Sequence, residues 1–220
     1  IVSRNYILDE RPDCIINIVD ATNLERNLYL TTQLMEIDVP VIVALNMMDA
    51  VEKSGDRIDA KELERKIGVP VAEISALKGN GIKELMDRAI KISKLPRKGE
   101  TVLKNSPIAH LIQDVAIALE SQNVAAPLFH AVKLSEMDEI EAAMHPELMP
   151  MVDRYKETFS DDTFGTDFEA IVADARYRYI SANYASVFRK EKGDQSRLTK
   201  SDKVDRALTH RIWGIPIFLV

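Results

Sequence analysis

The first 95 residues alternate between short apolar runs and segments with helical spacing. Three largely apolar runs, at residues 14–19, 41–45 and 69–74, predict β-strands. The segments with helical spacing lie between and after them, at about 22–38, 60–67 and 82–93. Strands separated by helices in this way predict a parallel α/β sheet with helices on both faces.

Local signals set the ends of two of these helices. Thr22 and Glu25 have the spacing of a capping box, in which a hydroxyl and a carboxylate each bind a free backbone N–H. Asp59 is expected to cap the helix at 60–67, and Gly68 to end it. The run at 14–19 does not alternate between polar and apolar residues, so it needs cover on both faces. We therefore expect further strands before residue 1 and, without them, exposed apolar surface on this strand.

Beyond residue 95 the strand signal fades, and the second half is predicted to be all-helical. Residues 96–105 have the composition of a linker, and Ser106 with Pro107 predicts the start of a helix that runs to about Ser121. Further helices are expected at about 126–134, 136–144, 147–158, 168–190 and 199–210. The long helix is expected to direct one row of residues inward: Phe168, Ile171, Val172, Ala175, Tyr179, Ala182 and Val187.

Composition narrows the class of protein. The 220 residues carry 35 acidic and 29 basic side chains, a net charge of −6, which argues against a dedicated nucleic-acid binder. One cysteine excludes a disulfide framework, and no apolar run reaches the roughly 20 residues of a membrane span. Basic Arg206, His210 and Arg211 precede Trp213 and an apolar stretch at 215–220, a pattern typical of the cytoplasmic start of a membrane helix. The alternative is a hydrophobic tail that docks on the helical domain.

The strongest chemical signal follows the second predicted strand, where Asn46, Met47, Met48 and Asp49 form an N-x-x-D motif. Ligands of open parallel sheets bind outside the carboxyl ends of the strands. A carboxylate at this place can accept hydrogen bonds from both the ring N–H and the exocyclic amine of guanine. The alternative for Asn46 or Asp49 alone is a helix N-cap.

A second signal, Ser75, Ala76 and Leu77 followed by Lys78, comes directly after the third strand. The backbone N–H of Ala76 can donate to the guanine carbonyl oxygen, and Ser75 can support the loop. An ordinary turn is the alternative, but two such motifs after consecutive strands favour a guanine-nucleotide domain.

Other polar residues give weaker signals. The histidines, His110, His130, His145 and His210, lack ligand spacing, so no metal site is predicted among them. The acidic residues Glu136, Asp138, Glu139 and Glu141 are expected to form a solvated helix face, and Cys14 to be a small core residue.

The two motifs together resemble the base-recognition motifs of small GTPases and, more narrowly, the GTPase domain of the ferrous iron transport protein B (FeoB) family. The resemblance is carried by residues 20–31, 44–49, 75–81, 173–180 and 208–218. It implies guanine contacts by Asn46, Met47, Met48, Asp49, Ser75, Ala76 and Leu77. It also implies a partial GTPase domain at 1–95, a linker at 96–105, a helical domain at 106–210 and the start of a first transmembrane segment at 211–220.

The resemblance further implies GTP or GDP as ligand and Fe²⁺ as the transported substrate. The expected partners are the protein's own membrane domain and small iron-transport accessory proteins, with no nucleic acid, at the cytoplasmic side of the bacterial inner membrane. Mg²⁺ is expected only together with motifs that this chain lacks.

Those motifs are the phosphate loop G-x-x-x-x-G-K-[ST], a switch threonine and a D-x-x-G after a strand. We therefore assign no catalytic residue and expect the chain alone to bind GTP poorly and not to hydrolyse it. Two other interpretations stay open: a soluble translation-factor-like GTPase with a helical effector domain, and a non-enzymatic interaction module built on a degenerate nucleotide fold.

Overall fold

The computed structural model describes residues 2–189, which fall within one compact unit, with side chains from residue 4 onward. The helix expected at 199–210 and the membrane segment expected at 211–220 lie outside these described residues. None of the described helices is both long and apolar enough to cross a bilayer.

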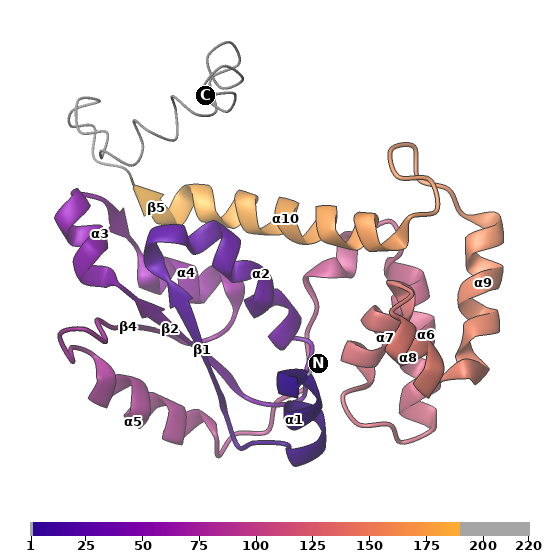
Figure 1. Ribbon diagram of the computed structural model, residues 1–220, viewed down its shortest axis with the longest axis horizontal. Helices are drawn as coiled ribbons and strands as arrows, with labels where there is room; N and C mark the ends of the chain where they lie inside the picture. The colour runs from indigo at the N-terminus through magenta and orange to yellow at the C-terminus, as the bar shows by residue number, and fades with distance from the viewer. Residues whose placement is uncertain (1, 190–220) are drawn as a thin grey trace, which may run out of the picture. The chain divides into compact units, whose positions relative to one another are not determined.

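The first half forms the predicted parallel sheet. Strands β1 (Ile15–Asp20), β2 (Val41–Asn46) and β4 (Val71–Glu73) pair in the order β1-β2-β4, with Ile15 opposite Val41 and Val43 opposite Val71. Helices α2 (Leu24–Leu34), α4 (Ala60–Ile67) and α10 (Phe168–Val187) cover one face, and α5 (Ile82–Ile92) covers the other (Figure 1). The predicted fold class is confirmed.

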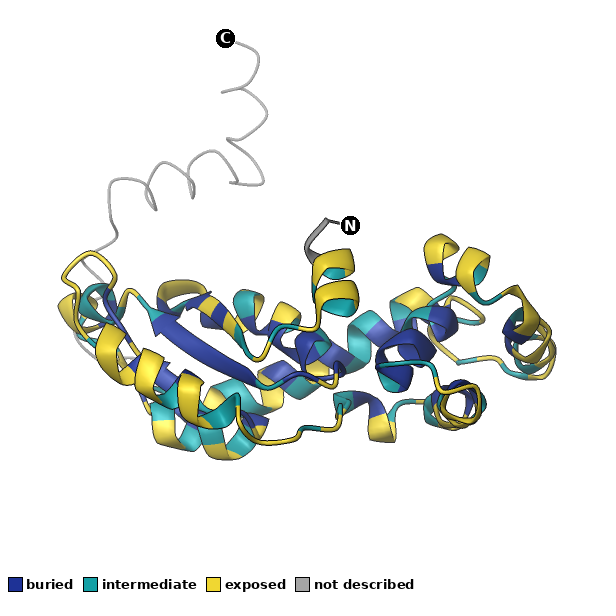
Figure 2. Cartoon of the chain, turned by 90° about the horizontal axis from the view of Figure 1, so that it is seen from below, coloured by how far each residue is buried: buried dark blue, intermediate teal, exposed yellow. Residues whose placement is uncertain are grey.

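The middle strand explains why the sheet is stable. Side chains of β2 from Val41 to Leu45 are fully buried, because helices pack on both faces (Figure 2). Val43 and Leu45 contact the α2, α4 and α10 side, while Ile42 and Ala44 contact the α5 side. Burial of apolar surface on both faces is the main favourable contribution to the free energy of folding, at roughly 25 cal/mol per Å² of surface removed from water.

Strand β1 is covered on one face only. Val19 and Asn17 are buried, whereas Ile16 is 36% and Ile18 65% exposed. The exposed apolar surface predicted for this strand is thus confirmed. Cys14 lies just before β1 and is only partly buried, so it is a boundary residue and not a core residue.

The second half is helical, as predicted. Its elements are η2 (Val102–Asn105), α6 (Ala109–Ser121), α7 (Pro127–Ser135), α8 (Glu139–Met144), η3 (Pro146–Leu148), α9 (Met149–Thr158) and α10. Six short elements have no counterpart in the sequence predictions. They are η2, α1 (Val2–Glu10), η1 (Ala21–Asn23), α3 (Met48–Ser54), β3 (Arg57–Ile58) and β5 (Phe188–Arg189), of which β3 and β5 pair antiparallel.

Three capping residues were predicted, Thr22, Asp59 and Ser106, and the structure confirms only Asp59. Asp59 Oδ1 accepts from the N–H of Glu62 at 2.9 Å, so that cap is confirmed. The Thr22–Glu25 capping box is wrong, because Asp20 Oδ1 holds both the N–H and the hydroxyl of Thr22, at 2.8 and 2.7 Å. A charged acceptor outcompetes the neutral hydroxyl as a cap and forms η1 instead.

The Ser106 cap is also wrong. The preceding residues form η2, so α6 begins only at Ala109, where no side chain caps the helix. Ser106 contributes its backbone carbonyl, which accepts from the N–H of Ala109 at 3.1 Å, and its hydroxyl is buried without a hydrogen-bond partner.

Helix α10 joins the two halves. Phe168, Ile171 and Val172 pack in the helical core, and Val187 packs against the sheet side, as expected. Ala182 was predicted to face inward and is exposed. The inward row follows the i, i+4 spacing 168, 172, 176, 180 instead, which places Arg176 and Ile180 inside.

Arg176 forms a buried ion pair with Glu36, and both side chains are 0% exposed. Its Nη2 lies 2.9 Å from each carboxylate oxygen of Glu36, and its Nη1 donates to Thr32 Oγ1 at 3.0 Å. The hydroxyl of Thr101 donates to the same carboxylate at 2.7 Å. Burial raises the pKa of Glu36, and Arg176 opposes that shift. The pair therefore ties α10 to the turn after α2.

Arg176→Met is expected to lower the free energy of unfolding by about 3–5 kcal/mol, because it leaves the buried Glu36 carboxylate without its positively charged partner. Urea unfolding followed by circular dichroism measures the loss. Arg178→Met is the matched control, since Arg178 is 75% exposed and pairs with Asp174 on the surface, and such pairs contribute under about 1 kcal/mol. Equal losses in the two variants would contradict the role of the buried pair.

Candidate functional site

The predicted site residues meet at the carboxyl edge of the sheet. Strand β2 ends at Asn46, and Met47 adopts a left-handed conformation (φ 66°) that turns the chain into α3. The loop after β4 is closed by two backbone hydrogen bonds of 3.1 Å between Ser75 and Asn80. A backbone hydrogen bond of 3.3 Å from Met48 N to Ile74 O joins the two loops.

Two side chains of the N-x-x-D motif bind the second loop. Ser75 Oγ donates to Asp49 Oδ1 at 2.8 Å, and the backbone N–H of Ala76 donates to Asn46 Oδ1 at 3.0 Å. Lys78 Nζ lies 3.7 Å from Asp49 Oδ2. The two motifs, about thirty residues apart, therefore form one connected unit.

These contacts decide between the alternatives for Asn46 and Asp49. The N-cap residue of α3 is Met47, and no side chain caps that helix. The helix-cap interpretation is therefore wrong for both residues. Their polar atoms instead hold the two loops against each other.

The electrostatics suit recognition of hydrogen-bond donors. The Ser75 hydroxyl, together with the charge of Lys78, lowers the pKa of Asp49, so the carboxylate stays ionised and accepts only. Ser75 is buried, whereas Met47 and Leu77 are 44% and 91% exposed. The two motif loops that carry Asp49 and Ser75 therefore each also carry an exposed apolar side chain, Met47 in the first and Leu77 in the second.

One predicted contact has a different partner in this structure. The N–H of Ala76, expected to donate to a guanine carbonyl, donates to Asn46 Oδ1. A ligand carbonyl would have to share this N–H with Asn46. The same bond fixes the Asn46 amide, because its oxygen faces Ala76 and its nitrogen is left to donate elsewhere.

Comparison with known proteins shows to which family the chain is related. A sequence profile described as "Ferrous iron transport protein B" matches residues 1–89. The chain is 34% identical to the Fe(2+) transporter FeoB of Escherichia coli K12, and 34% identical to a Fe(2+) transport protein A/FeoB fusion protein of Porphyromonas gingivalis. Each match covers 99% of this chain but only 28% and 27% of the relative's length.

Solved structures of FeoB proteins resemble this chain in both fold and sequence. NFeoB from S. thermophilus bound to mGMPPNP is 33% identical, with a TM-score of 0.73 over 88% of this chain and 73% of that one. A point mutant of the same NFeoB, bound to GDP, gives 0.75 at 33% identity, over 86% and 74%. The chain belongs to the FeoB family. It spans little more than a quarter of the curated FeoB relatives it matches.

A second cluster of polar residues in this FeoB-family chain was missed from the sequence. His130, Glu141 and His145 lie together in the helical half. The prediction of a solvated acidic face is wrong for Glu141, whose side chain is fully buried. Local spacing shows only part of the cluster: Glu141 and His145 are four residues apart at the end of α8, whereas His130 joins them only when α7 packs against α8.

Gly81 lets the loop return to the sheet. It has a φ of 75°, and a Cβ there would lie 2.1 Å from the carbonyl oxygen of Glu73. Gly81→Ala is expected to reduce the free energy of unfolding by roughly 2 kcal/mol more than Gly79→Ala. Gly79 has a similar φ of 71° but open space around it, so its variant bears only the cost of the left-handed conformation. Chemical denaturation measures both, and equal costs would contradict the close approach.

Ser75→Ala is expected to raise the pKa of Asp49 towards its ordinary value, because the variant removes the largest stabilising contact of the carboxylate. An NMR titration of the Asp49 carboxyl carbon measures the shift. A lowered folded-state pKa stabilises the fold above the unfolded-state pKa, and that stability is lost as pH falls through the folded-state pKa. Ser121→Ala is the control, since Ser121 bonds only a helix carbonyl. An unchanged Asp49 pKa in Ser75→Ala would contradict the assignment.

Proposed function

We propose that this chain supplies the guanine-recognition edge and the helical domain of a GTP-dependent ferrous iron transporter. The observation that carries the proposal is the joining of Asn46, Asp49, Ser75 and Ala76 into one hydrogen-bonded unit at the carboxyl edge of a parallel sheet. Family membership supports the transporter over the translation-factor interpretation, because the matched relatives are Fe(2+) transporters.

The proposed recognition follows from the hydrogen-bonding groups. Ionised Asp49 accepts from the ring N–H and the exocyclic amine of guanine, a pair of donors that adenine does not present. The Asn46 amide nitrogen donates to the opposite side of the base, because the amide oxygen is held by Ala76. Met47 and Leu77 cover the base faces. That the matched S. thermophilus structures hold mGMPPNP and GDP supports this assignment.

The phosphates need groups that this chain does not contain. Its sequence has no phosphate loop, so we propose that phosphates and Mg²⁺ are held by another part of the transporter, and that this chain alone binds GTP weakly and does not hydrolyse it. The exposed face of β1, with Ile16 and Ile18, is the surface we expect that part to cover.

The proposed domain organisation keeps the boundaries given above: a partial GTPase domain at 1–95, a linker at 96–105, a helical domain at 106–210 and the start of a membrane segment at 211–220. Helix α10 packs against both halves, which supports a helical domain that responds to the GTPase domain. Fe²⁺ is the proposed cargo, at the cytoplasmic side of the inner membrane. The fusion of one relative to Fe(2+) transport protein A supports a small accessory partner.

Asp49→Asn in the full transporter that contains this chain tests the proposal. Xanthine carries a carbonyl where guanine carries the exocyclic amine, and an asparagine amide can donate to it. The variant is expected to lose about ten- to hundredfold in GDP affinity, the cost of one or two hydrogen bonds to a charged acceptor, and to gain affinity for xanthosine diphosphate.

Fluorescent-nucleotide competition measures both affinities. Asp87→Asn is the matched control, because Asp87 is an exposed residue of α5 outside the site, and it should bind both nucleotides as the wild type does. Unchanged GDP affinity in Asp49→Asn would show that the base is bound elsewhere.

A further inference from the structure

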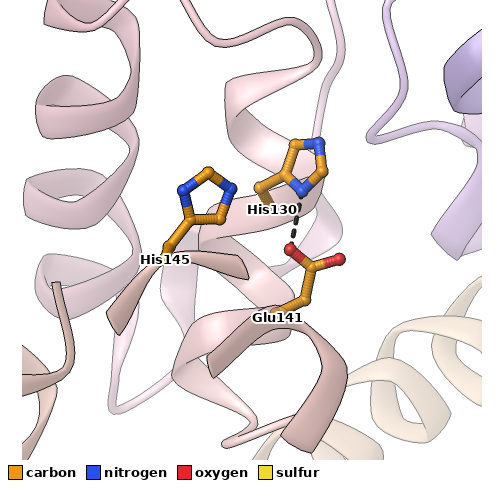
Figure 3. Close-up of side chains that lie close together, drawn as sticks. All are labelled: His130, Glu141 and His145. Carbon is orange, nitrogen blue, oxygen red and sulfur yellow. Dashed lines mark hydrogen bonds and ion pairs between the residues drawn. The ribbon is translucent and has the colours of Figure 1, made fainter. Parts of the chain in front are cut away.

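A cluster of two imidazoles and one carboxylate lies inside the helical half. His130 belongs to α7, Glu141 to α8, and His145 follows α8 directly. One possible ligand atom from each lies within 4.8 Å of the others (Figure 3). Within the described part of the chain, this is the one group of three or more such residues placed to hold a metal ion.

The carboxylate of Glu141 is fully buried and has two partners. Its Oε2 lies 2.7 Å from His130 Nδ1, and its Oε1 accepts from Arg4 Nη2 at 2.6 Å. The His130 side chain is 7% exposed and that of Arg4 is 17% exposed. The negative charge that attracts a cation is therefore held in place by neighbouring side chains.

His145 has a polar atom that no protein group satisfies. Its Nε2 is buried without a hydrogen-bond partner, while its Nδ1 lies 3.5 Å from Glu147 Oε1. Figure 3 shows a ring nitrogen of His145 turned towards the His130–Glu141 pair. A buried polar atom without a partner costs about 1–3 kcal/mol, so this orientation needs an explanation.

We propose that His130, Glu141 and His145 bind one divalent first-row transition-metal ion. Two imidazoles and one carboxylate are a ligand set that suits Zn²⁺ and Fe²⁺. Ca²⁺ and Mg²⁺ prefer all-oxygen sites, so these hard ions are poor candidates. The proposal stands independently of the nucleotide function.

The ligand atoms have to move to accept the ion: those that now lie up to 4.8 Å apart come closer, to roughly 3 Å. Two ligand atoms bonded at about 2.0–2.2 Å to one ion lie roughly 3 Å apart, so His130 Nδ1 and Glu141 Oε2 have to separate by a few tenths of an ångström. The neutral His130 ring changes tautomer, its one proton leaving Nδ1 and binding Nε2, and the Nδ1 lone pair then binds the ion. Arg4 orients the carboxylate from behind through Oε1, as outer-shell groups of metal sites do.

A purely structural role explains part of the cluster. A buried His130–Glu141–Arg4 charge network needs no ion, and the positive charge of Arg4 opposes a dication. Such a network leaves His145 Nε2 without a partner, however, whereas a shared ion satisfies all three ligand residues. An ion there would also hold α7 and α8 together and stabilise the folded state by mass action.

Calorimetric titration of the full 220-residue chain with Zn²⁺, and with Fe²⁺ under anaerobic conditions, tests the site. We expect one ion per chain, and at least a tenfold loss of affinity in His145→Ala. His110→Ala is the matched control, because His110 is an exposed residue of α6 outside the cluster, and it should bind as the wild type does. Binding of either ion with this pattern supports the proposal. No ion bound by the wild type, or equal affinity in His145→Ala, would overturn it.

A second measurement needs no variant of the buried cluster. Co²⁺ added to the wild-type chain should give visible d–d absorption bands that saturate at one equivalent and disappear when Zn²⁺ is added. A spectrum equal to that of Co²⁺ in buffer would overturn the proposal, even if His145→Ala failed to fold.

Discussion

The fully buried carboxylate of Glu36 has to be compensated by a charge, and the compensating side chain, Arg176, lies 140 residues further along the chain. The bidentate pair ties the turn after α2 to the middle of α10. Packing of α10 on both hydrophobic cores depends on that position, since its first turns bury Phe168 and its last bury Val187. The sheet half and the helical half thus share one element whose register is set by a buried charge.

Hydrogen bonds between polar groups also shape two other centres, a partly exposed one at the sheet edge and a buried one in the helical half. At the sheet edge, Asn46 and Asp49 are satisfied by the neighbouring loop, which keeps the carboxylate ionised and the amide oriented before any ligand is present. Such preorganisation lowers the ordering cost of binding. In the helical half, Glu141 is paired but His145 Nε2 is not, and that difference points to a ligand at the second centre.

Patterns of local origin could be predicted from the sequence. The apolar runs of β1, β2 and β4, the Asp59 cap and the glycine after α4 all depend on neighbours within a few residues, and the structure has them where expected. The two motif loops also lie at one edge of the sheet, because parallel strands bring their carboxyl ends together there. Thr22 does not cap a helix because Asp20 binds its N–H and its hydroxyl, and Ser106 does not because the residues before it form η2 and its carbonyl accepts from the N–H of Ala109.

Features of long-range origin could not be predicted. By residue type Arg176 is expected on the surface, and only its pairing with Glu36 explains its burial. Because the buried row of α10 contains an arginine, the apolar pattern alone does not identify the buried face of this helix. Glu141 likewise belongs to an acidic stretch that is expected to be solvated, and it is buried because His130 of α7 and Arg4 contact its carboxylate. In both cases tertiary contacts, absent from local spacing, decide the burial.

Recognition of guanine by the loops after β2 and β4 is the function on which the proposal depends. A ¹⁵N–¹H NMR titration of the labelled chain with GDP, and separately with ADP, measures it at the residues concerned. We expect GDP to shift the backbone amide signal of Ala76 and those of its loop neighbours, while ADP at the same concentration leaves them in place. Equal shifts with both nucleotides, or GDP-induced shifts that avoid Ala76, would contradict guanine recognition by these loops.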